Sequence, residues 1–339
     1  MLRFLSTLGA LLLLAAAAQA GEIGFRRIVI DADGPRPLNV SLWYPTRDTT
    51  PSGPVGENRV FVGVPAVTDA APDHRSHPLV VLSHGYGGSW RNLNWLAGEL
   101  VAEGYAVAAP DHPGTTTFDR DPTRAATLWE RPRDLSRTID AVLRDPALAG
   151  RIDPDRIAAI GHSLGGWTVA ALAGARFDPM LFARDCEDHP SPRTCGLSDE
   201  LGLTDPAIGR DMRDPRIKVF VTLDLGLARG FTPDSLAGVR LPALVFGAGV
   251  DIGDLPAALE SGWLAEHLPP ETARLVMIPD AMHFSFMQLC KPGAAALIEA
   301  EDPGDGIVCH DGGGRGRAAI HGEIAGTIIR FLTQSLPPR

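Results

Sequence analysis

The stretch IAAIGHSLGG, residues 157–166, places one serine at an abrupt change of local pattern. The apolar run before it is typical of a buried strand, and the small apolar residues from Leu164 onward follow a helical pattern. Ser163 lies between them, with Gly161 two residues before it and Gly165 two residues after it. In this G-x-S-x-G arrangement the chain turns sharply from strand to helix, and the glycines remove side chains that would collide across the turn. We therefore expect the Ser163 hydroxyl to lie exposed at a strand's carboxyl end and a helix's N-terminus.

Strand-like and helix-like segments alternate on both sides of this turn. Short apolar or β-branched runs predict strands at Ile28–Ile30, Val40–Trp43, Leu79–Leu82, Tyr105–Ala109, Ile157–Ile160, Val219–Leu223, Ala243–Phe246 and Leu275–Ile278. Helical patterns occur at Asn92–Glu103, Asp134–Leu143, Leu164–Ala173, Pro256–His267 and Ala318–Leu332. This alternation predicts an α/β fold, with a mostly parallel sheet covered by helices on both faces. The first two runs have no helix between them and predict an antiparallel hairpin at the sheet edge. We expect one domain over residues 21–339.

A serine hydroxyl is a weak nucleophile near neutral pH and needs a base, which we expect to be a histidine at the end of a later strand. His283 follows the run Leu275–Ile278 by a short loop, on the same sheet edge as Ser163, and is the predicted base. His84 and His162 lie in tight glycine turns, where we expect them to support the backbone.

The base in turn needs a carboxylate that orients it. Asp251 follows the strand Ala243–Phe246 through a short glycine turn and is the favoured acid. Asp224 ends the previous strand and is the alternative, and Asp254 is a weaker third choice.

A serine that attacks a carbonyl carbon also needs donors for the negative oxygen that forms in the reaction. The backbone N–H of Leu164, at the start of the helix after Ser163, is one predicted donor. The glycine-rich loop LSHGYGG, residues 82–88, follows a predicted strand, and we expect the backbone N–H of Tyr86 to be the second.

Two long connections interrupt the alternation, at His112–Pro132 and Phe177–Arg216. Connections of this length inside a compact domain are often functional, so we expect lid-like insertions. A surface insertion fastened by a disulfide is the alternative for the second of them.

The first twenty residues differ from the rest of the chain. Arg3 precedes an almost unbroken apolar run, and Ala18 and Ala20 form an A-x-A cleavage signature before Gly21. Residues 1–20 are therefore predicted to be a signal peptide, and the mature protein to be periplasmic or secreted. The net charge of −10 disfavours nucleic acid and anionic membrane surfaces as partners. No later apolar run reaches the ~20 residues of a membrane span, so we expect no stable membrane insertion after cleavage.

Four cysteines in an exported chain predict two disulfides. Of the three connectivities, spacing favours the pairing of neighbours, Cys186 with Cys195 and Cys290 with Cys309. A structural zinc site would need closely paired ligands that this sequence lacks, so no metal is expected.

Five motifs together resemble the α/β-hydrolase superfamily: VVLSHGYGG, AAPDHPG, GHSLGG, LVFGAGVD and DAMHFSF. Within it, the chain looks like the bacterial predicted dienelactone hydrolases, which are similar to platelet-activating-factor acetylhydrolases and to cutinase-like polyester hydrolases. The resemblance runs from about Leu79 to the C-terminus and implies an eight-stranded, mostly parallel sheet. The cutinase-like pattern puts the acid at Asp251, and the acetylhydrolase pattern puts it at Asp224. The dienelactone hydrolases use a cysteine where Ser163 stands, so lactone specificity does not carry over.

The resemblance also implies ester hydrolysis through an acyl-enzyme, without a metal or organic cofactor. The leading hypothesis is thus an exported serine esterase for a small-molecule ester, with a preference for short acyl chains. Two alternatives stay open: a catalytically silent hydrolase-fold protein that binds lipid or a protein partner, and an acyltransferase that uses the same triad.

Overall fold

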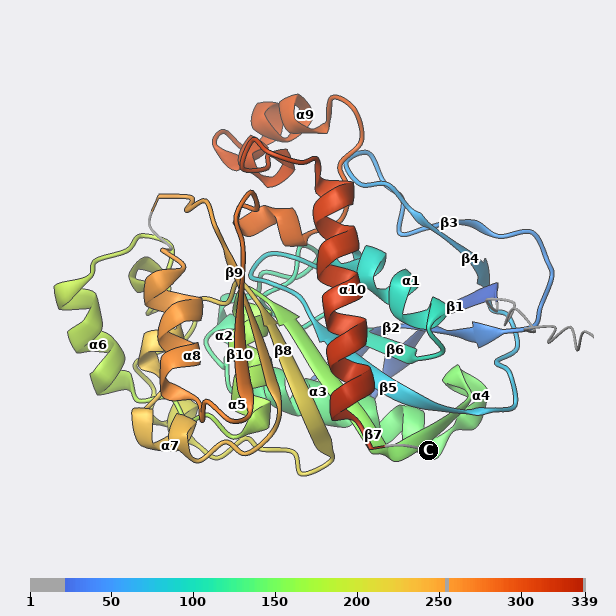
Figure 1. Cartoon of the computed structure of the whole chain (residues 1–339), viewed down its shortest axis with the longest axis horizontal. Coiled ribbons are helices and arrows are strands. Elements are labelled where there is room, and N and C mark those ends of the chain that lie inside the picture. The colour runs from blue at the N-terminus through green and yellow to red at the C-terminus, as the bar shows by residue number, and fades with distance from the viewer. Residues whose placement is uncertain (1–21, 254–255, 338–339) are drawn as a thin grey trace, which may run out of the picture.

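The structure is a computed structural model that describes residues 22–253 and 256–337. The predicted signal peptide, residues 1–20, and the third-choice acid Asp254 lie outside the described residues. The described chain forms one ten-stranded sheet in the order β10-β9-β8-β7-β5-β6-β2-β1-β4-β3 (Figure 1). Its strands are β1 (Glu22–Ile30), β2 (Leu38–Thr46), β3 (Gly53–Val55), β4 (Val64–Thr68), β5 (Ser76–Ser83), β6 (Ala106–Pro110), β7 (Arg151–His162), β8 (Ile217–Leu223), β9 (Ala243–Ala248) and β10 (Ala273–Ile278).

All the predicted strands are present, and the region from β5 to β10 is parallel as expected. The hairpin of β1 and β2 is antiparallel, but it is not the edge of the sheet. The edge is formed by β4, which pairs with β1, and by β3, which pairs with β4. Pro54, Gly63 and Pro65 break the apolar alternation in this stretch, which explains why the sequence predicted eight strands rather than ten.

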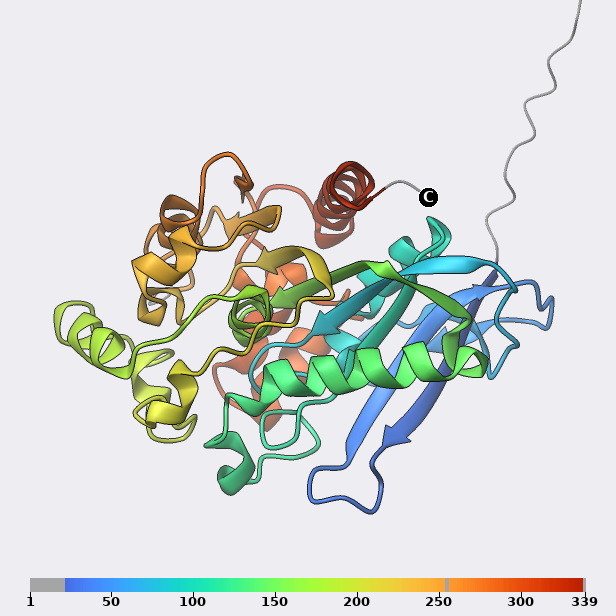
Figure 2. The same cartoon turned by 90° about the horizontal axis from the view of Figure 1, so that it is seen from below.

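Helices cover both faces of the sheet, as predicted. The α-helices are α1 (Asn94–Ala102), α2 (Pro122–Ala125), α3 (Glu130–Arg144), α4 (Pro146–Ala149), α5 (Leu164–Ala173), α6 (Pro179–Asp188), α7 (Pro233–Ala237), α8 (Trp263–His267), α9 (Ala294–Glu301) and α10 (Arg317–Ser335). Shorter turns are η1 (Trp90–Leu93), η2 (Cys195–Leu197), η3 (Pro206–Gly209), η4 (Ala228–Gly230), the π-helical η5 (Ala258–Gly262), η6 (His283–Phe286) and η7 (Asp305–Cys309). The sheet lies between α1 and α10 on one face and α3 and α5 on the other (Figure 2).

Two apolar cores follow from this layering. Along β5, Leu79 and Val81 belong to the core beneath α3 and α5, whereas Val80 and Leu82 belong to the core beneath α1 and α10. Successive side chains of a strand point to opposite faces, so a strand buried on both sides is apolar at every position. This double burial fixes the strand ends, from which the candidate site is built.

The two long connections carry little regular structure. The first, after β6, contains α2, and the second, between α5 and β8, contains α6, η2 and η3. The predicted disulfides are confirmed: Cys186 is bonded to Cys195 within the second connection, and Cys290 is bonded to Cys309 after η6. Among the described residues, no helix combines the length and apolar character that a membrane crossing requires.

Candidate active site

Ser163 occupies a strained turn between β7 and α5. Its backbone φ is 55° and its ψ is −120°, which lies outside the regions that most residues with a side chain adopt. A conformation of this kind persists only where the surrounding structure enforces it, and such residues cluster at functional sites. The side chain of Ser163 is half-buried. The expected sharp turn from strand to helix is thus present.

The flanking glycines are required by close backbone approach. A Cβ atom at Gly161 would lie 2.0 Å from the carbonyl oxygen of Gly165. A Cβ atom at Gly165 would lie 2.0 Å from the carbonyl oxygen of Ser83, at the end of the neighbouring strand β5. Both distances are far below van der Waals contact, so neither position accepts a side chain without displacement of the backbone around Ser163.

His283 begins the short turn η6 after β10 and is paired with Asp224, which directly follows β8. The Nδ1 atom of His283 lies 2.7 Å from Oδ2 of Asp224, and both residues are 5% exposed. The second carboxylate oxygen, Oδ1, accepts a hydrogen bond from the backbone N–H of Ala248 at 2.8 Å. With both oxygens engaged, the carboxylate is fixed, and a proton on Nδ1 leaves Nε2 of the imidazole free to act as a base.

His283 is paired with Asp224 and not with Asp251, the acid that the sequence favoured. Its Oδ1 atom accepts a hydrogen bond from the backbone N–H of Ala257 at 2.9 Å, and the residue is exposed. Strand order gives the physical reason: β8 is the direct neighbour of β7, whereas β9 is one strand further from Ser163. Asp251 caps the segment that follows it, which is a common use of aspartate in a loop.

Backbone contacts bring the serine turn and the histidine turn together. The N–H of Ser163 donates to the carbonyl oxygen of Leu223 at 3.0 Å, and the next residue is Asp224. The Nε2–H of His162 donates to the carbonyl oxygen of His283 at 2.8 Å, and the two imidazole rings lie 4.8 Å apart. Burial lowers the pKa of His162 to about 3, so its ring is neutral. The expected backbone-supporting function of His162 is confirmed.

The predicted oxyanion donors also lie at this edge of the sheet. Within the described chain, neither the N–H of Tyr86 nor the N–H of Leu164 donates to another group. Leu164 is the first residue of α5, where the helix dipole adds positive potential. A Cβ atom at Gly85 would lie 3.1 Å from Cβ of Ser163, so the loop that carries Tyr86 passes close to the serine.

His84 fixes the direction of the peptide between Gly85 and Tyr86. Its Nε2 atom accepts a hydrogen bond from the N–H of His112 at 3.0 Å, and its Nδ1 lies 2.7 Å from the carbonyl oxygen of Gly85. Burial lowers the pKa of His84 well below its usual value, so a neutral ring with its proton on Nδ1 satisfies both contacts. The expectation that His84 supports the backbone is therefore confirmed.

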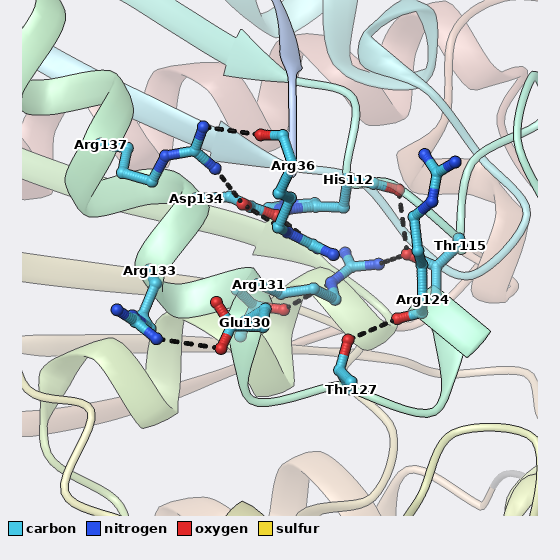
Figure 3. A network of polar contacts seen from close by, with 12 residues as sticks. Arg36, His112, Thr115, Arg124, Thr127, Glu130, Arg131, Arg133, Asp134 and Arg137 are labelled. Carbon is cyan, nitrogen blue, oxygen red and sulfur yellow. Dashed lines mark hydrogen bonds and ion pairs between the residues drawn. The ribbon is translucent and has the colours of Figure 1, made fainter. Parts of the chain in front are cut away.

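A network of charged and polar side chains beneath this loop, in which Arg131, Asp134 and His112 are buried, was not predicted. Its centre is Arg131, 1% exposed, in the first turn of α3 (Figure 3). Next to it, Asp134 is bonded to Arg36, to Arg137 and to His112. Arg131 precedes the buried Leu135 by four residues and therefore lies on the apolar face of the helix. A charged residue on the apolar face of a helix was therefore the signal in the sequence that pointed to this network.

The second long connection reaches the candidate site through Tyr86. The phenol of Tyr86 donates a hydrogen bond to the exposed Glu200, in the segment between η2 and η3. Burial, followed by this hydrogen bond and the negative charge of Glu200, raises the pKa of Tyr86 to about 12. The second long connection is therefore in contact with the loop that carries Tyr86.

The turn that carries His283 is held by the segment that precedes α10. The hydroxyl of Ser285 donates to Asp311 at 2.6 Å, and Arg317 forms an ion pair with the same carboxylate at 3.0 Å. Arg317 also donates to the carbonyl oxygen of Gln288, and the Cys290–Cys309 disulfide lies directly beyond it. These contacts restrain the backbone on the C-terminal side of His283.

One cavity lies apart from Ser163, Asp224 and His283. A cavity of 660 Å³ is lined by residues near the C-terminal end of α5, among them Arg176 and Phe177, and by neither Ser163 nor His283. In the part of the chain that the structure describes, no group of three or more His, Cys, Asp or Glu side chains could hold a metal ion.

Comparison with known proteins agrees with the architecture. A family model described as "Serine aminopeptidase, S33" matches residues 74–181. A ferulic acid esterase from Streptomyces cinnamoneus superposes with a TM-score of 0.65 over 96% of this chain and 94% of that chain, at 23% sequence identity. The chain has the α/β-hydrolase fold. In this α/β-hydrolase fold the loops after parallel strands meet at one edge, which explains why Tyr86, Ser163, Asp224 and His283 converge.

Similarity to curated proteins is confined to a part of the chain. "Cutinase est2" of Thermobifida alba is 32% identical over 108 residues, which are 31% of this chain and 33% of that protein. "Bis(hydroxyethyl) terephthalate hydrolase" of Streptomyces coelicolor is 30% identical over 104 residues, 31% of this chain and 30% of that protein. The matched part thus spans about a third of the length of these relatives. The resemblance to cutinase-like hydrolases is confirmed over that part.

Proposed function

We propose that this protein is an exported serine esterase that hydrolyses carboxylic esters through Ser163, His283 and Asp224. The observation that carries the proposal is the 2.7 Å contact between Nδ1 of His283 and Oδ2 of Asp224, formed beside a serine in a strained turn. Nucleophile, base and orienting acid then follow the chain order Ser163, Asp224, His283, which is the order of α/β-hydrolase triads.

In the acylation step, Nε2 of His283 accepts the hydroxyl proton of Ser163 while Oγ attacks the ester carbonyl carbon. The carbonyl π electrons move to oxygen, and the resulting anion receives hydrogen bonds from the N–H groups of Tyr86 and Leu164. Asp224 stabilises the imidazolium that forms. When the tetrahedral intermediate collapses, the bond to the alcohol oxygen breaks and His283 returns the proton to that oxygen.

Deacylation repeats these events with water as the nucleophile. His283 accepts a proton from water, hydroxide attacks the acyl carbon, and the bond to Oγ of Ser163 breaks as the proton returns to Oγ. The carboxylic acid is released and the enzyme is restored. Removal of one oxyanion donor typically costs about 10²–10³ in kcat, so the two backbone donors carry much of the expected acceleration.

The substrate class rests on the relatives, whose printed names are cutinase, bis(hydroxyethyl) terephthalate hydrolase and ferulic acid esterase. Their shared chemistry is the carboxylic ester, and we propose a small ester with a short acyl chain. Export is supported by the two disulfides, which form and persist in oxidising compartments. Residues 1–20 are the proposed signal peptide, residues 21–339 the catalytic domain, and the location the periplasm or the medium.

A panel of p-nitrophenyl esters with graded acyl length tests the proposal, with Ser163→Ala as the control. We expect hydrolysis by the wild-type protein that is highest for short chains and lost in Ser163→Ala. An optimum at long chains would refute the chain-length proposal alone. A folded wild-type protein that hydrolyses none of the esters would favour a silent binding protein, and release of acyl product only with an added alcohol would favour an acyltransferase.

A further inference from the structure

Arg131 is a buried cation whose hydrogen bonds all go to neutral oxygen atoms. Its Nε donates to Oγ1 of Thr168 at 3.0 Å, and its Nη1 donates to Oγ1 of Thr115 at 2.8 Å. Its Nη2 donates to Oγ of Ser83 at 3.3 Å and to the carbonyl oxygen of His84. Figure 3 shows the guanidinium of Arg131 pointing towards Thr115.

Desolvation makes this arrangement costly. Transfer of a charge from water to the protein interior is unfavourable, and apolar residues of similar volume often replace buried charges without loss of stability. The nearby carboxylate of Asp134 does not compensate by a direct hydrogen bond, because its described partners are Arg36, Arg137 and His112. Burial lowers the pKa of Arg131 to about 9, so the guanidinium stays charged at neutral pH. The fold alone therefore does not explain an arginine here.

Three of the four acceptors of Arg131 belong to the elements that carry the proposed oxyanion donors. Ser83 and His84 lead directly into the loop of Tyr86. Thr168 lies on α5, and its hydroxyl donates to the carbonyl oxygen of Leu164 at 2.9 Å. One guanidinium thus joins the backbone of the first donor loop to the first turn of the helix that carries the second donor.

The fourth acceptor, Thr115, lies on the loop after β6 and contacts the Tyr86 loop on the far side of Tyr86. The hydroxyl oxygen of Thr115 accepts a hydrogen bond from Nη1 of Arg131. The carbonyl oxygen of Thr115 accepts a hydrogen bond from the N–H of Gly87 at 3.0 Å. Arg131 therefore holds the loop directly before Tyr86, through His84, and holds it indirectly after Tyr86, through Thr115.

Because the peptide group is planar, contacts to a carbonyl oxygen also fix the direction in which the N–H of the next residue points. In a trans peptide the C=O and the next N–H point in opposite directions. The carbonyl oxygen of Gly85 accepts from Nδ1 of His84 and from the N–H of Gly88, at 2.7 and 3.2 Å. The held carbonyl oxygen of Gly85 fixes the N–H of Tyr86 in the opposite direction, and the contact of Arg131 with the carbonyl oxygen of His84 holds the peptide directly before it.

We propose that Arg131 is a positioning residue of the oxyanion hole, which holds the Tyr86 loop and the start of α5 at the separation that the tetrahedral anion requires. This inference rests on the proposed esterase function. It assigns Arg131 no contact with substrate. Loss of Arg131 should weaken binding of the tetrahedral anion and leave binding of the uncharged ester nearly unchanged.

The test compares Arg131→Met with Arg137→Met, which removes a second arginine from the same helix and the same charged network without touching the Tyr86 loop. The assays are kcat and KM with p-nitrophenyl acetate, and inhibition by a phenylboronic acid, which forms a tetrahedral anion on a serine oxygen. For Arg131→Met we expect kcat to fall about 10- to 100-fold, somewhat less than for loss of a whole donor. We expect its KM to change less than about 3-fold, and the boronic acid to bind more weakly in proportion to kcat/KM.

Arg137→Met should change none of these values more than about 2-fold, because its partners are Asp31, Asp134 and the carbonyl oxygen of Arg36. If Arg131→Met does not fold, Arg131→Lys decides, because a lysine keeps the charge but not the planar fork of donors. It should also lose kcat and boronic acid affinity, with KM retained.

The inference is overturned if a folded Arg131 variant keeps wild-type kcat and boronic acid affinity, or if it loses no more than Arg137→Met. Failure of the proposed function looks different, because the wild-type protein itself would then show no hydrolysis that depends on Ser163.

Discussion

The Nε2 atom of His162 lies 2.8 Å from the carbonyl oxygen of His283, so the residue before Ser163 is hydrogen-bonded to the backbone of the predicted base. The contact joins the end of β7 to the turn after β10, across 121 positions of sequence. It restrains the backbone of the base directly, whereas Asp224 restrains its side chain.

His162→Ala should therefore reduce kcat with little change in KM, because the carbonyl oxygen of His283 loses its donor and the base becomes less well positioned. A displacement of about 1 Å can cost up to about 100-fold in rate, so we expect a loss of at least about 10-fold. Steady-state hydrolysis of p-nitrophenyl acetate measures it. His162→Gln, which keeps an N–H donor, serves as the control and should lose less, and equal kcat in wild-type protein and His162→Ala would contradict the positioning.

Asp224→Asn and Asp251→Asn form a matched pair that separates the two candidate acids. Asp224→Asn should lower kcat about 10⁴-fold, since an amide facing Nδ1 of His283 favours the wrong tautomer. Asp251→Asn keeps an oxygen acceptor for the N–H of Ala257, so its kcat should stay within about 2-fold of wild type. The same hydrolysis assay distinguishes the two acids. A larger loss of kcat in Asp251→Asn than in Asp224→Asn would identify Asp251 as the acid.

The fold could be predicted from sequence where local pattern and burial agree. The strands β5, β6, β8 and β9 are buried on both faces and have nearly continuous apolar sequences. The Ser163 turn needs glycines because other backbone segments pass very close to it. The edge strands β3 and β4 could not be predicted because Pro54 and Pro65 conceal their pattern. The pairing of His283 with Asp224 rather than Asp251 could not be predicted, because spacing along the chain does not reveal that β8, rather than β9, lies beside β7.

Gly165→Ala should destabilise the protein and reduce activity. The new Cβ would lie 2.0 Å from the carbonyl oxygen of Ser83, so β5 and α5 must separate at the site. We expect a loss of about 1–3 kcal/mol in the free energy of unfolding, measured by urea denaturation. Gly322→Ala is the control: nothing lies within 4 Å of its Cβ, and alanine in a helix should add about 0.5–1 kcal/mol. Gly165→Ala as stable as wild type would contradict the close approach.

Glu260 should make stability depend on pH. It is 3% exposed, its Oε2 atom accepts the N–H of Ala228 at 2.7 Å, and burial raises its pKa from 4.5 to about 7. Because the folded state binds this proton more tightly than the unfolded state, the stability it contributes is present below pH 4.5 and is lost as pH rises through 7.

Glu260→Gln keeps an oxygen acceptor and does not titrate. Between pH 5 and pH 8 the variant should gain about 2 kcal/mol relative to wild type in urea unfolding. Parallel pH profiles for the two proteins would show that Glu260 is not protonated in the folded state near neutral pH.

The charged network joins residues that lie far apart in the sequence. The helix α3 has a clear apolar face at Leu135, Ile139 and Val142, and Arg131 lies on that face at helical spacing. A pattern can show that this arginine is buried, but its acceptors come from β5, from the loop after β6 and from α5. Only the tertiary structure brings those groups together, so the connection to the Tyr86 loop had no local signal.

The most direct measurement of the central claim is covalent labelling with a fluorophosphonate, located by peptide mass spectrometry. The account predicts one adduct, on Ser163, absent from Ser163→Ala and formed at least about 100-fold more slowly in His283→Ala, because the hydroxyl then lacks its base. A folded wild-type protein that stays unlabelled, or that carries the adduct on another residue, would contradict it.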